Sequence, residues 1–297
     1  NSPLKWEKVN KNTWRVFTNG SNTLRIRYSV YAYELSVRTS FLDESHGYLN
    51  GASIFLYVNA LKNVPATLTI VPFKDWKVVS TGLPKSKTGE FVYDVPNYDI
   101  LVDSPIEIGN HQTIIFSSKN IPHQIAIVGD SIRDQEQFKK DMQSVTEAAM
   151  NIFGEIPFSN YTFIIHLSDG RGGLEHLNSS QIIFSRNAVY NKESYKRLLA
   201  IAAHEYFHAW NVKRLRPIEL GPFDYSNENY TSLLYLSEGF TETYENYILR
   251  IAGIDTEQEY LESIASDITT FENKPGKEFQ SLIESSFDAW IKYYRPD

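Results

Sequence analysis

The sequence contains no cysteine among its 297 residues. This absence excludes disulfide bonds, iron–sulfur clusters, zinc sites with cysteine ligands and thiol nucleophiles. It leaves the cellular compartment open, because chains without cysteine are compatible with both oxidising and reducing surroundings.

Positive charge is also in short supply. The chain has 29 Lys and Arg residues against 36 Asp and Glu residues, which gives a formal net charge of −7. A protein that wraps nucleic acid needs clustered positive charge, so we predict no nucleic-acid partner. No apolar stretch approaches the roughly 18 residues that a membrane-spanning helix requires, so we also predict no membrane span.

Aromatic residues, by contrast, are abundant, at 14% of the chain. Disordered chains lack such residues, so we expect a packed core, and the length suits two domains. The chain starts at Asn1 without a Met or a signal-peptide pattern, and it stops soon after a helix-like stretch. We therefore expect the natural protein to be longer. Removal of a leader would explain the missing Met and would favour a periplasmic or secreted location over a cytoplasmic one. An excerpt of a longer chain would explain the missing Met equally well.

The first 120 residues have the pattern of β-strands. Apolar side chains alternate with their neighbours along residues 24–31, which is the period of a half-buried strand. Similar short runs occur at residues 53–58, 66–71, 90–95 and 112–116, with turn signals such as Asn50-Gly51 and Gly109-Asn110 between them. The pattern predicts an antiparallel, sandwich-like β domain over residues 1–120.

The pattern changes to mixed strands and helices after this point. Short strands are predicted at residues 123–129 and 161–167, and Gly154 is typical of the C-cap of a helix between them. Further helices are predicted over residues 194–212, 230–251, 256–271 and 279–294. The chain is therefore predicted to be an α+β multidomain protein with a second, mostly helical domain over residues 121–297.

The sharpest feature is the HExxH motif His204-Glu205-Tyr206-Phe207-His208, which lies in one of the predicted helices. Residues four apart share one face of a helix, so the two imidazoles can converge on one metal ion. Glu205 lies beside them and can polarise a bound water. Zinc is the natural metal for two imidazoles and a carboxylate. Two histidines at this spacing also occur by chance, so the motif needs a third ligand to support it.

Glu238 is the candidate for this third ligand. It lies on the next long predicted helix, directly after the apolar run 233–236. A carboxylate so close to a buried run usually needs a partner, although most helix glutamates are simply solvated. Three protein ligands would leave the open position that a catalytic zinc requires.

Several segments resemble the glycyl aminopeptidase family of zinc metallopeptidases, which belongs to the gluzincins. They are residues 204–217, Gly221-Pro222-Phe223-Asp224-Tyr225 and Glu238-Gly239-Phe240-Thr241. Residues 31–39 and 98–107 are similar to the N-terminal domain of that family, so the resemblance spans nearly the whole chain. It implies an N-terminal β domain followed by a thermolysin-like zincin catalytic domain that is incomplete at its C-terminus.

The resemblance also implies roles for the residues of the motif. His204, His208 and Glu238 would bind Zn²⁺, and Glu205 would act as the general base. In related aminopeptidases a Tyr downstream of the third ligand stabilises the oxyanion. We expect this Tyr beyond Pro296 and assign no Tyr of the chain to the role.

A second motif, Gly172-Gly173-Leu174-Glu175-His176, follows the predicted strand 161–167. It is similar to a glycine-rich motif on an edge strand of related aminopeptidases, in which a Glu holds the free α-amine of the substrate. Glu175 would therefore bind the amine, with Gly172, Gly173 and His176 as further substrate-binding positions. The alternative for the motif is a glycine-rich turn with an exposed Glu, and the alternative for His176 is a structural hydrogen bond. A carboxylate at a set distance from the scissile bond restricts cleavage to one residue at a time.

The expected substrate is thus a peptide with a free N-terminus, and the resemblance implies a small first residue, Gly or Ala. Two alternatives stay open: a zinc endopeptidase with the same metal site, and a peptide-binding relative without catalysis. N-acetylation of a test peptide separates the first alternative, since only an endopeptidase should tolerate it. The sequence does not indicate the oligomeric state.

Basic and histidine residues outside the motifs have weaker signals. We expect Lys213 and Arg214, with Arg216, to pair with acidic neighbours, and a role in binding a substrate carboxylate is the alternative. His46, His111 and His123 fall in loop-like contexts and are predicted to be exposed, whereas His166 is predicted to pack in the core.

Overall fold

The structure is a computed structural model that describes residues 3–294, and it divides into two compact units, residues 1–31 and 32–297. The first unit contains one antiparallel hairpin, formed by β1 (Trp6–Asn10) and β2 (Thr13–Val16). The strand predicted over residues 24–31 is wrong. Among the described residues no segment pairs with it, and an alternating pattern makes a strand only where a neighbour accepts its backbone hydrogen bonds.

The second unit begins with a four-stranded antiparallel sheet, in the order β3-β4-β8-β6. Its strands are β3 (Phe41–Leu42), β4 (His46–Leu49), β6 (Val78–Thr81) and β8 (Ile106–Gly109). A separate antiparallel pair is formed by β5 (Ala66–Thr69) and β7 (Val92–Val95), as the sequence pattern predicted. The short helices here are α1 (Gly51–Ile54), η1 (Asn59–Leu61) and α2 (Tyr98–Val102).

The strand predicted over residues 53–58 is wrong, since helix α1 occupies its start. The side chain of Asn50 caps this helix by accepting a hydrogen bond from the backbone N–H of Ala52. A local side-chain cap of this kind favours a helical turn over an extended chain.

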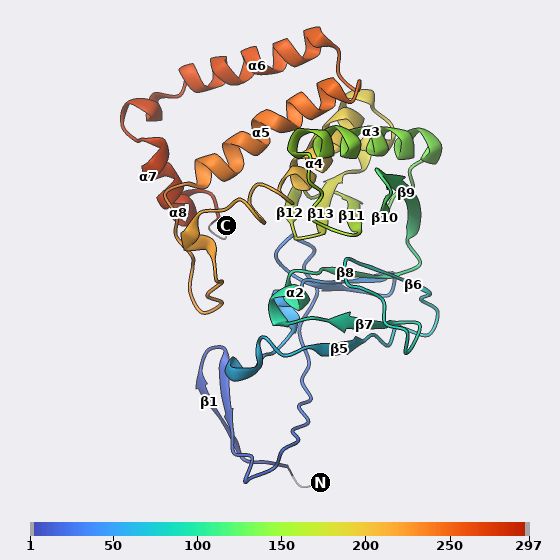
Figure 1. The fold of residues 1–297 in the computed structure, drawn as a ribbon, viewed down its shortest axis with the longest axis vertical. Coiled ribbons are helices and arrows are strands. Elements are labelled where there is room, and N and C mark those ends of the chain that lie inside the picture. Colours follow the sequence, from blue (N-terminus) through green and yellow to red (C-terminus); the bar gives the residue numbers. More distant parts are fainter. Residues whose placement is uncertain (1–2, 295–297) are drawn as a thin grey trace. The chain divides into compact units, whose positions relative to one another are not determined.

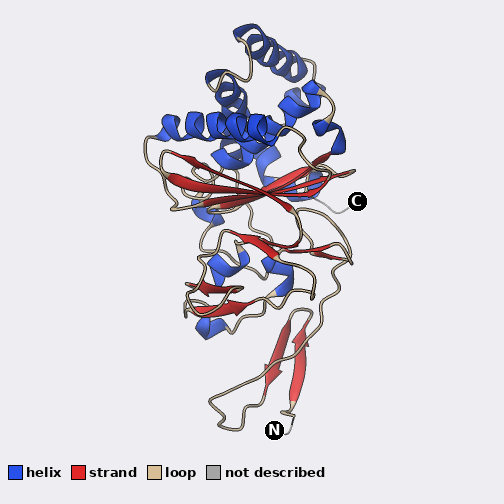
Figure 2. Ribbon diagram, turned by 90° about the vertical axis from the view of Figure 1, so that its right-hand side faces the viewer, coloured by secondary structure: helices blue, strands red, loops and turns tan. Residues whose placement is uncertain are grey.

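A five-stranded sheet follows, in the order β12-β13-β11-β10-β9 (Figures 1 and 2). Its strands are β9 (Gln112–Ser118), β10 (Ile121–Gly129), β11 (Tyr161–Ser168), β12 (Gly172–Glu175) and β13 (Ser179–Ser185). The three central strands are parallel, and the edge strands β9 and β12 are antiparallel to their neighbours. Strands β9 and β10 lie on either side of residue 120 and pair with each other. The division into domains 1–120 and 121–297 stays a prediction.

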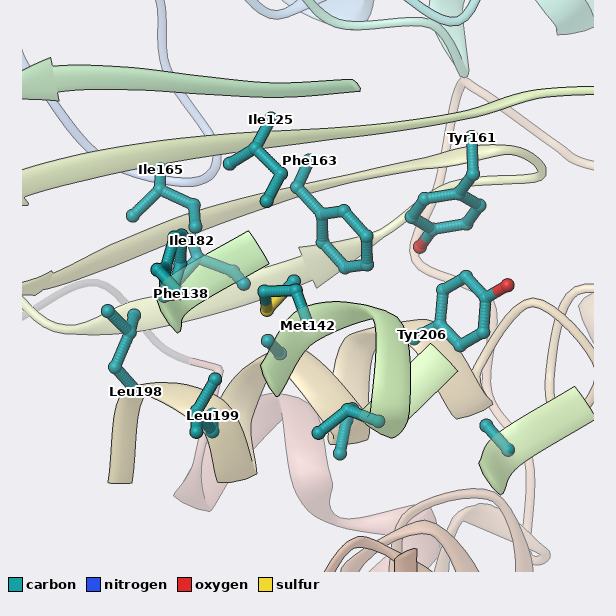
Figure 3. Packing of buried hydrophobic residues seen from close by; sticks show 14 of the residues in the cluster. Ile125, Phe138, Met142, Tyr161, Phe163, Ile165, Ile182, Leu198, Leu199 and Tyr206 are labelled. Carbon is teal, nitrogen blue, oxygen red and sulfur yellow. The ribbon is translucent and has the colours of Figure 1, made fainter. Parts of the chain in front are cut away.

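Both faces of this sheet are covered, which explains why β11 is almost continuously buried. Tyr161, Phe163 and Ile165 point towards helices α3 (Gln135–Phe153) and α4 (Lys192–Phe207), where they join the main hydrophobic core (Figure 3). Ile164, on the opposite face, packs against Tyr48 of the four-stranded sheet. The period of two along β11 therefore divides its side chains between two different neighbours.

Helices dominate the rest of the chain (Figure 1). They are η2 (Arg186–Val189), η3 (Ile218–Leu220), α5 (Leu234–Ile251), α6 (Glu257–Glu272), η4 (Pro275–Glu278), α7 (Leu282–Phe287) and α8 (Ala289–Lys292). Gly154 caps α3 with a positive φ, as predicted. The single helix predicted over residues 279–294 is wrong, because the chain breaks it at Asp288 into α7 and α8. Within residues 3–294, the helices lack the length and apolar character needed to cross a bilayer.

Candidate metal centre

Helix α4 presents the two histidines of the HExxH motif side by side. Asn191 caps its N-terminus, and Leu198, Leu199 and Ala202 anchor it in the main core. His204 and His208 lie one turn apart, and their Nε2 atoms are 3.1 Å apart. The predicted convergence of the two imidazoles is therefore present.

Helix α4 ends earlier than the predicted residue 212, at Phe207, with His208 as its C-cap. The chain continues with hydrogen bonds that span three and five residues in place of the four of an α-helix. The N–H of Trp210 donates to the carbonyl of Phe207, and the N–H of Lys213 donates to the carbonyl of His208. This change of winding brings the carbonyl of Asn211 back to Nδ1 of His208, at 2.6 Å. The end of the helix thus fixes the orientation of the second histidine ring.

Glu238 reaches the same point from helix α5, which packs against α4. Its Oε2 atom lies 3.6 Å from Nε2 of His204 and 3.6 Å from Nε2 of His208. The point equidistant from these three atoms lies about 2 Å from each, which is the distance at which nitrogen and oxygen ligands bind zinc. The three side chains therefore fit one metal ion without rearrangement.

A second layer of contacts holds the two rings. Nδ1 of His204 donates to Oε2 of Glu245, 2.8 Å away, while Nδ1 of His208 faces the Asn211 carbonyl. With a proton on each Nδ1, both neutral rings present the lone pair of Nε2 to the centre. Glu238 and Glu245 lie two turns apart on α5, so one helix face supplies both carboxylates. Nothing in the local sequence pattern indicates the contact of Glu245 with His204.

The electrostatics of the cluster suit a cation. Burial would lower the pKa of His204, but its hydrogen bonds to Glu238 and Glu245 raise that pKa to about 11. Burial would raise the pKa of Glu238, but hydrogen bonds from both histidines hold it far below its usual range. The carboxylates thus stabilise positive charge at the point that a metal ion would occupy.

Glu205 lies beside this cluster and is nearly inaccessible, at 5% exposed. Burial raises the pKa of its carboxyl group, and the electrostatic effect of His208 and His204 only partly offsets this rise. Within residues 3–294 its Oε2 atom has no hydrogen-bond partner. A buried carboxylate with an unused acceptor and a raised pKa is suited to take a proton from water.

The edge strand β12 brings the glycine-rich motif to the same place. Glu175 is grouped with Glu205 and His208, with one ligand-type atom of each within 4.8 Å of the others. Gly173 lies on the same face of the strand, against the Glu205 side chain. Gly172 and His176 lie on the other face, where Gly172 approaches Val37 and His176 contacts Asp103.

The structure thus brings Gly173 and Glu175 to the metal cluster, whereas the ring of His176 lies against Asp103. The substrate-binding roles of all four motif residues stay predictions.

Tyr294 also reaches the site, although the sequence analysis expected its tyrosine beyond Pro296. Burial raises the pKa of the Tyr294 hydroxyl well above its usual range, and the nearby carboxylates of Glu238 and Glu175 raise it further. Arg38 lies over its ring, 5.7 Å from the centroid. Only the path of the chain after α8 places Tyr294 here, so no local sequence signal could have found it.

The predicted exposure of three histidines is wrong. His46 and His123 are 8% and 1% exposed, and His111 is only partly accessible. His46 and the predicted core residue His166 both hydrogen-bond to the fully buried Glu107, at 2.8 and 3.0 Å. This cluster lies between the two sheets, where polar groups need partners because water is excluded.

Comparison with known proteins agrees with this geometry. The sequence profile of the M61 glycyl aminopeptidase matches residues 197–297, which include the HExxH motif and Glu238. The profile of the Peptidase M61 N-terminal domain matches residues 1–110. The chain belongs to the M61 glycyl aminopeptidase family. A search of curated proteins found no match.

A solved structure is similar to this chain over the segment between the two profiles as well. The crystal structure of an aminopeptidase N family protein from Idiomarina loihiensis is similar over 98% of this chain, with a TM-score of 0.89 and 31% sequence identity. This chain spans about half of that protein, 51% of its length.

These matches confirm the family named from the sequence. They also confirm the predicted fold class, an N-terminal antiparallel β domain followed by a helix-rich domain of an aminopeptidase fold. M61 is a family of metallopeptidases, which supports peptide hydrolysis as the reaction class.

Proposed function

We propose that this chain carries the active site of a zinc aminopeptidase that removes single N-terminal residues, preferably Gly or Ala, from peptides. The observation that carries the proposal is the grouping of Glu175, Glu205 and His208 within 4.8 Å. It brings an amine-binding carboxylate, a general base and a metal ligand into one site. The family supports the choice of a peptide substrate.

Zn²⁺ is the proposed metal, held by His204, His208 and Glu238. Two imidazole nitrogens and one carboxylate oxygen are a typical catalytic zinc set, and they leave a position for water or substrate. When bound, zinc lowers the pKa of a coordinated water and polarises the substrate carbonyl.

Glu205 is the proposed general base. Its Oε2 atom takes a proton from the attacking water as the oxygen bonds to the carbonyl carbon. The same carboxyl group then gives the proton to the leaving nitrogen when the carbon–nitrogen bond breaks. The burial of this carboxyl group and the free acceptor on its Oε2 atom support this role, because the group can bind the water directly.

Glu175 and Tyr294 are proposed to complete the site. The Glu175 carboxylate binds the α-ammonium group of the substrate, and this fixes which peptide bond meets the metal. The Tyr294 hydroxyl donates a hydrogen bond to the oxygen that becomes negative during attack. Its high pKa keeps this proton in place at neutral pH.

A pair of substrates that differ only at the amine tests the proposal. We expect hydrolysis of glycyl-p-nitroanilide and none of its N-acetyl form, because acetylation removes the charge that Glu175 binds. Equal cleavage of free and acetylated peptides would instead identify an endopeptidase with the same metal site.

Two variants separate catalysis from peptide binding without catalysis. Glu205→Gln should keep its zinc, measured by atomic absorption, and lose about 10²–10⁴-fold in kcat. Glu175→Gln should mainly raise KM for the free-amine substrate. Zinc-loaded wild-type protein that binds peptide but hydrolyses none would support the non-catalytic alternative.

A further inference from the structure

The segment that follows Glu175 is held by one buried carboxylate from a distant part of the chain. Asp103, the C-cap residue of α2, accepts hydrogen bonds from the backbone N–H of Leu177 at 2.9 Å and from Nδ1 of His176 at 3.0 Å. It also forms an ion pair with Nζ of Lys213 at 2.8 Å. Three donors from two different segments therefore converge on this one side chain.

A second contact holds the same turn from the other side. Nη1 of Arg214 donates to the carbonyl of Leu177 at 2.9 Å. Its Nη2 donates to the carbonyl of Pro157 at 2.8 Å, so the guanidinium also binds a second part of the fold. Asp103 and Arg214 thus hold both the N–H and the C=O of Leu177.

Lys213 and Arg214 connect this turn to the C-terminal end of helix α4. Lys213 and Arg214 follow His208 closely in the chain, and the backbone N–H of Lys213 donates to the His208 carbonyl at 3.0 Å. The end of the strand that carries Glu175 is therefore connected, through Asp103 and Lys213, to the segment that directly follows His208.

The charges of Asp103 and Lys213 strengthen this connection. Burial would raise the pKa of Asp103, but Lys213 and His176 lower it to about 2, so the carboxylate stays ionised. Its side chain is 16% exposed and that of Lys213 is 12% exposed. A largely buried ion pair with further hydrogen bonds permits little displacement, because separating it leaves an uncompensated charge.

We propose that Asp103 is a positioning residue that sets the distance between the amine-binding carboxylate of Glu175 and the metal ligand His208. This inference rests on the proposed aminopeptidase function. An amine anchor selects one peptide bond only if its distance from the metal is fixed, and displacements of about 1 Å cost large factors in rate. Neither Asp103 nor Lys213 touches the substrate in this account.

The distance between Glu175 and the metal site can be tested with two substrates whose amine and carbonyl groups differ in separation by one carbon. Glycyl- and β-alanyl-p-nitroanilide both lack a side chain, and they differ by one methylene group between amine and carbonyl. Wild-type protein should strongly favour the glycyl substrate. In Asp103→Asn and Lys213→Met, the ratio of kcat/KM for the two substrates should fall roughly tenfold, because a loosened anchor accepts both lengths.

The control is Asp94→Asn, which removes one negative charge from an exposed position on β7. It should leave the ratio unchanged. A parallel loss of both activities in Asp103→Asn, with an unchanged ratio, would show a structural role only and overturn the proposal.

Hydrogen exchange provides a readout that needs no activity. The Leu177 amide should exchange at least tenfold faster in Asp103→Asn than in wild type, with zinc content unchanged. An unchanged exchange rate would overturn the tie itself. Failure of the wild-type protein to hydrolyse either substrate would instead overturn the proposed function and, with it, the distance-setting role.

Discussion

The carboxylate of Glu205 lies directly against the backbone of Gly173. A Cβ atom at position 173 would overlap Oε1 and Cδ of Glu205. Gly173 belongs to the edge strand β12 and Glu205 to helix α4, so this contact joins the strand that carries Glu175 to the proposed general base. The glycine is needed because any side chain would occupy the position of the carboxylate.

Gly173→Ala is therefore expected to displace Glu205 and reduce kcat/KM by about 10²-fold or more, since small displacements of a catalytic group are costly. The matched control is Gly172→Ala. Its Cβ would point to the other face of the strand, 3.3 Å from a methyl group of Val37, which can shift slightly. Steady-state kinetics on a glycyl substrate compare the two, and equal activities would contradict the expected steric role of Gly173.

Tyr294→Phe removes a single hydroxyl from the site. If that hydroxyl stabilises the developing oxyanion, kcat should fall about 10²-fold while KM changes little. Tyr293→Phe is the control, because the side chain of Tyr293 is exposed. A variant at Tyr294 that retains full kcat would leave the oxyanion role to another residue.

Glu245→Gln tests the support of the metal site. The amide accepts only a weaker hydrogen bond from Nδ1 of His204, so the ring is held less firmly and is a poorer ligand. We expect zinc affinity to fall about tenfold or more, measured by competition with a chelator. The same substitution at the exposed Glu278 serves as a control and should leave the affinity unchanged. Wild-type affinity in Glu245→Gln would refute the supporting role.

Glu107→Gln tests the buried cluster between the two sheets. His46 and His166 contact different oxygens of Glu107, and Gln would replace one of these acceptors with an NH2 group. We therefore expect a loss of about 3 kcal/mol in the free energy of unfolding at pH 7. Denaturant titration measures this loss, and the exposed Glu90→Gln is the control.

The loss at Glu107 should depend on pH. Burial raises the pKa of Glu107, but hydrogen bonds from His166 and His46 bring it below its ordinary value. A lowered pKa in the folded state stabilises the protein above the unfolded pKa of about 4.3, and that contribution disappears as pH falls through the folded pKa. The difference between wild type and variant should therefore shrink in acid, and a constant difference would contradict the charge-based account.

The local signals in the sequence predicted which side chains of the HExxH motif come together. Helical spacing placed His204 and His208 on one face, and the structure confirms their convergence within hydrogen-bonding distance. The apolar run before Glu238 suggested a carboxylate that needs a partner, and Glu238 does approach both rings. The run itself is only half-buried, and the Glu238 side chain is 43% exposed. The convergence of the two histidines was predictable because i and i+4 geometry is a property of one short helical segment.

Predictions that depended on distant partners fared worse. The alternation in residues 24–31 is real, but no described segment pairs with it. His46 was expected in an exposed loop, and instead it begins β4 and binds the buried Glu107. Whether a polar residue is buried depends on which elements pack over it, and the local sequence pattern does not indicate those elements.

The sequence by itself determined which histidines and carboxylates are available, their spacing along the chain and the position of Gly173, which permits the close approach of Glu205. These features follow directly from the order of the residues. Only the tertiary structure decided which distant groups complete the site. It placed Tyr294 next to Glu238, set Glu245 against His204 and tied the strand of Glu175 to Lys213 through Asp103. The physical reason is that these contacts join segments tens to more than a hundred residues apart, and packing of the sheets and helices alone brings such segments together.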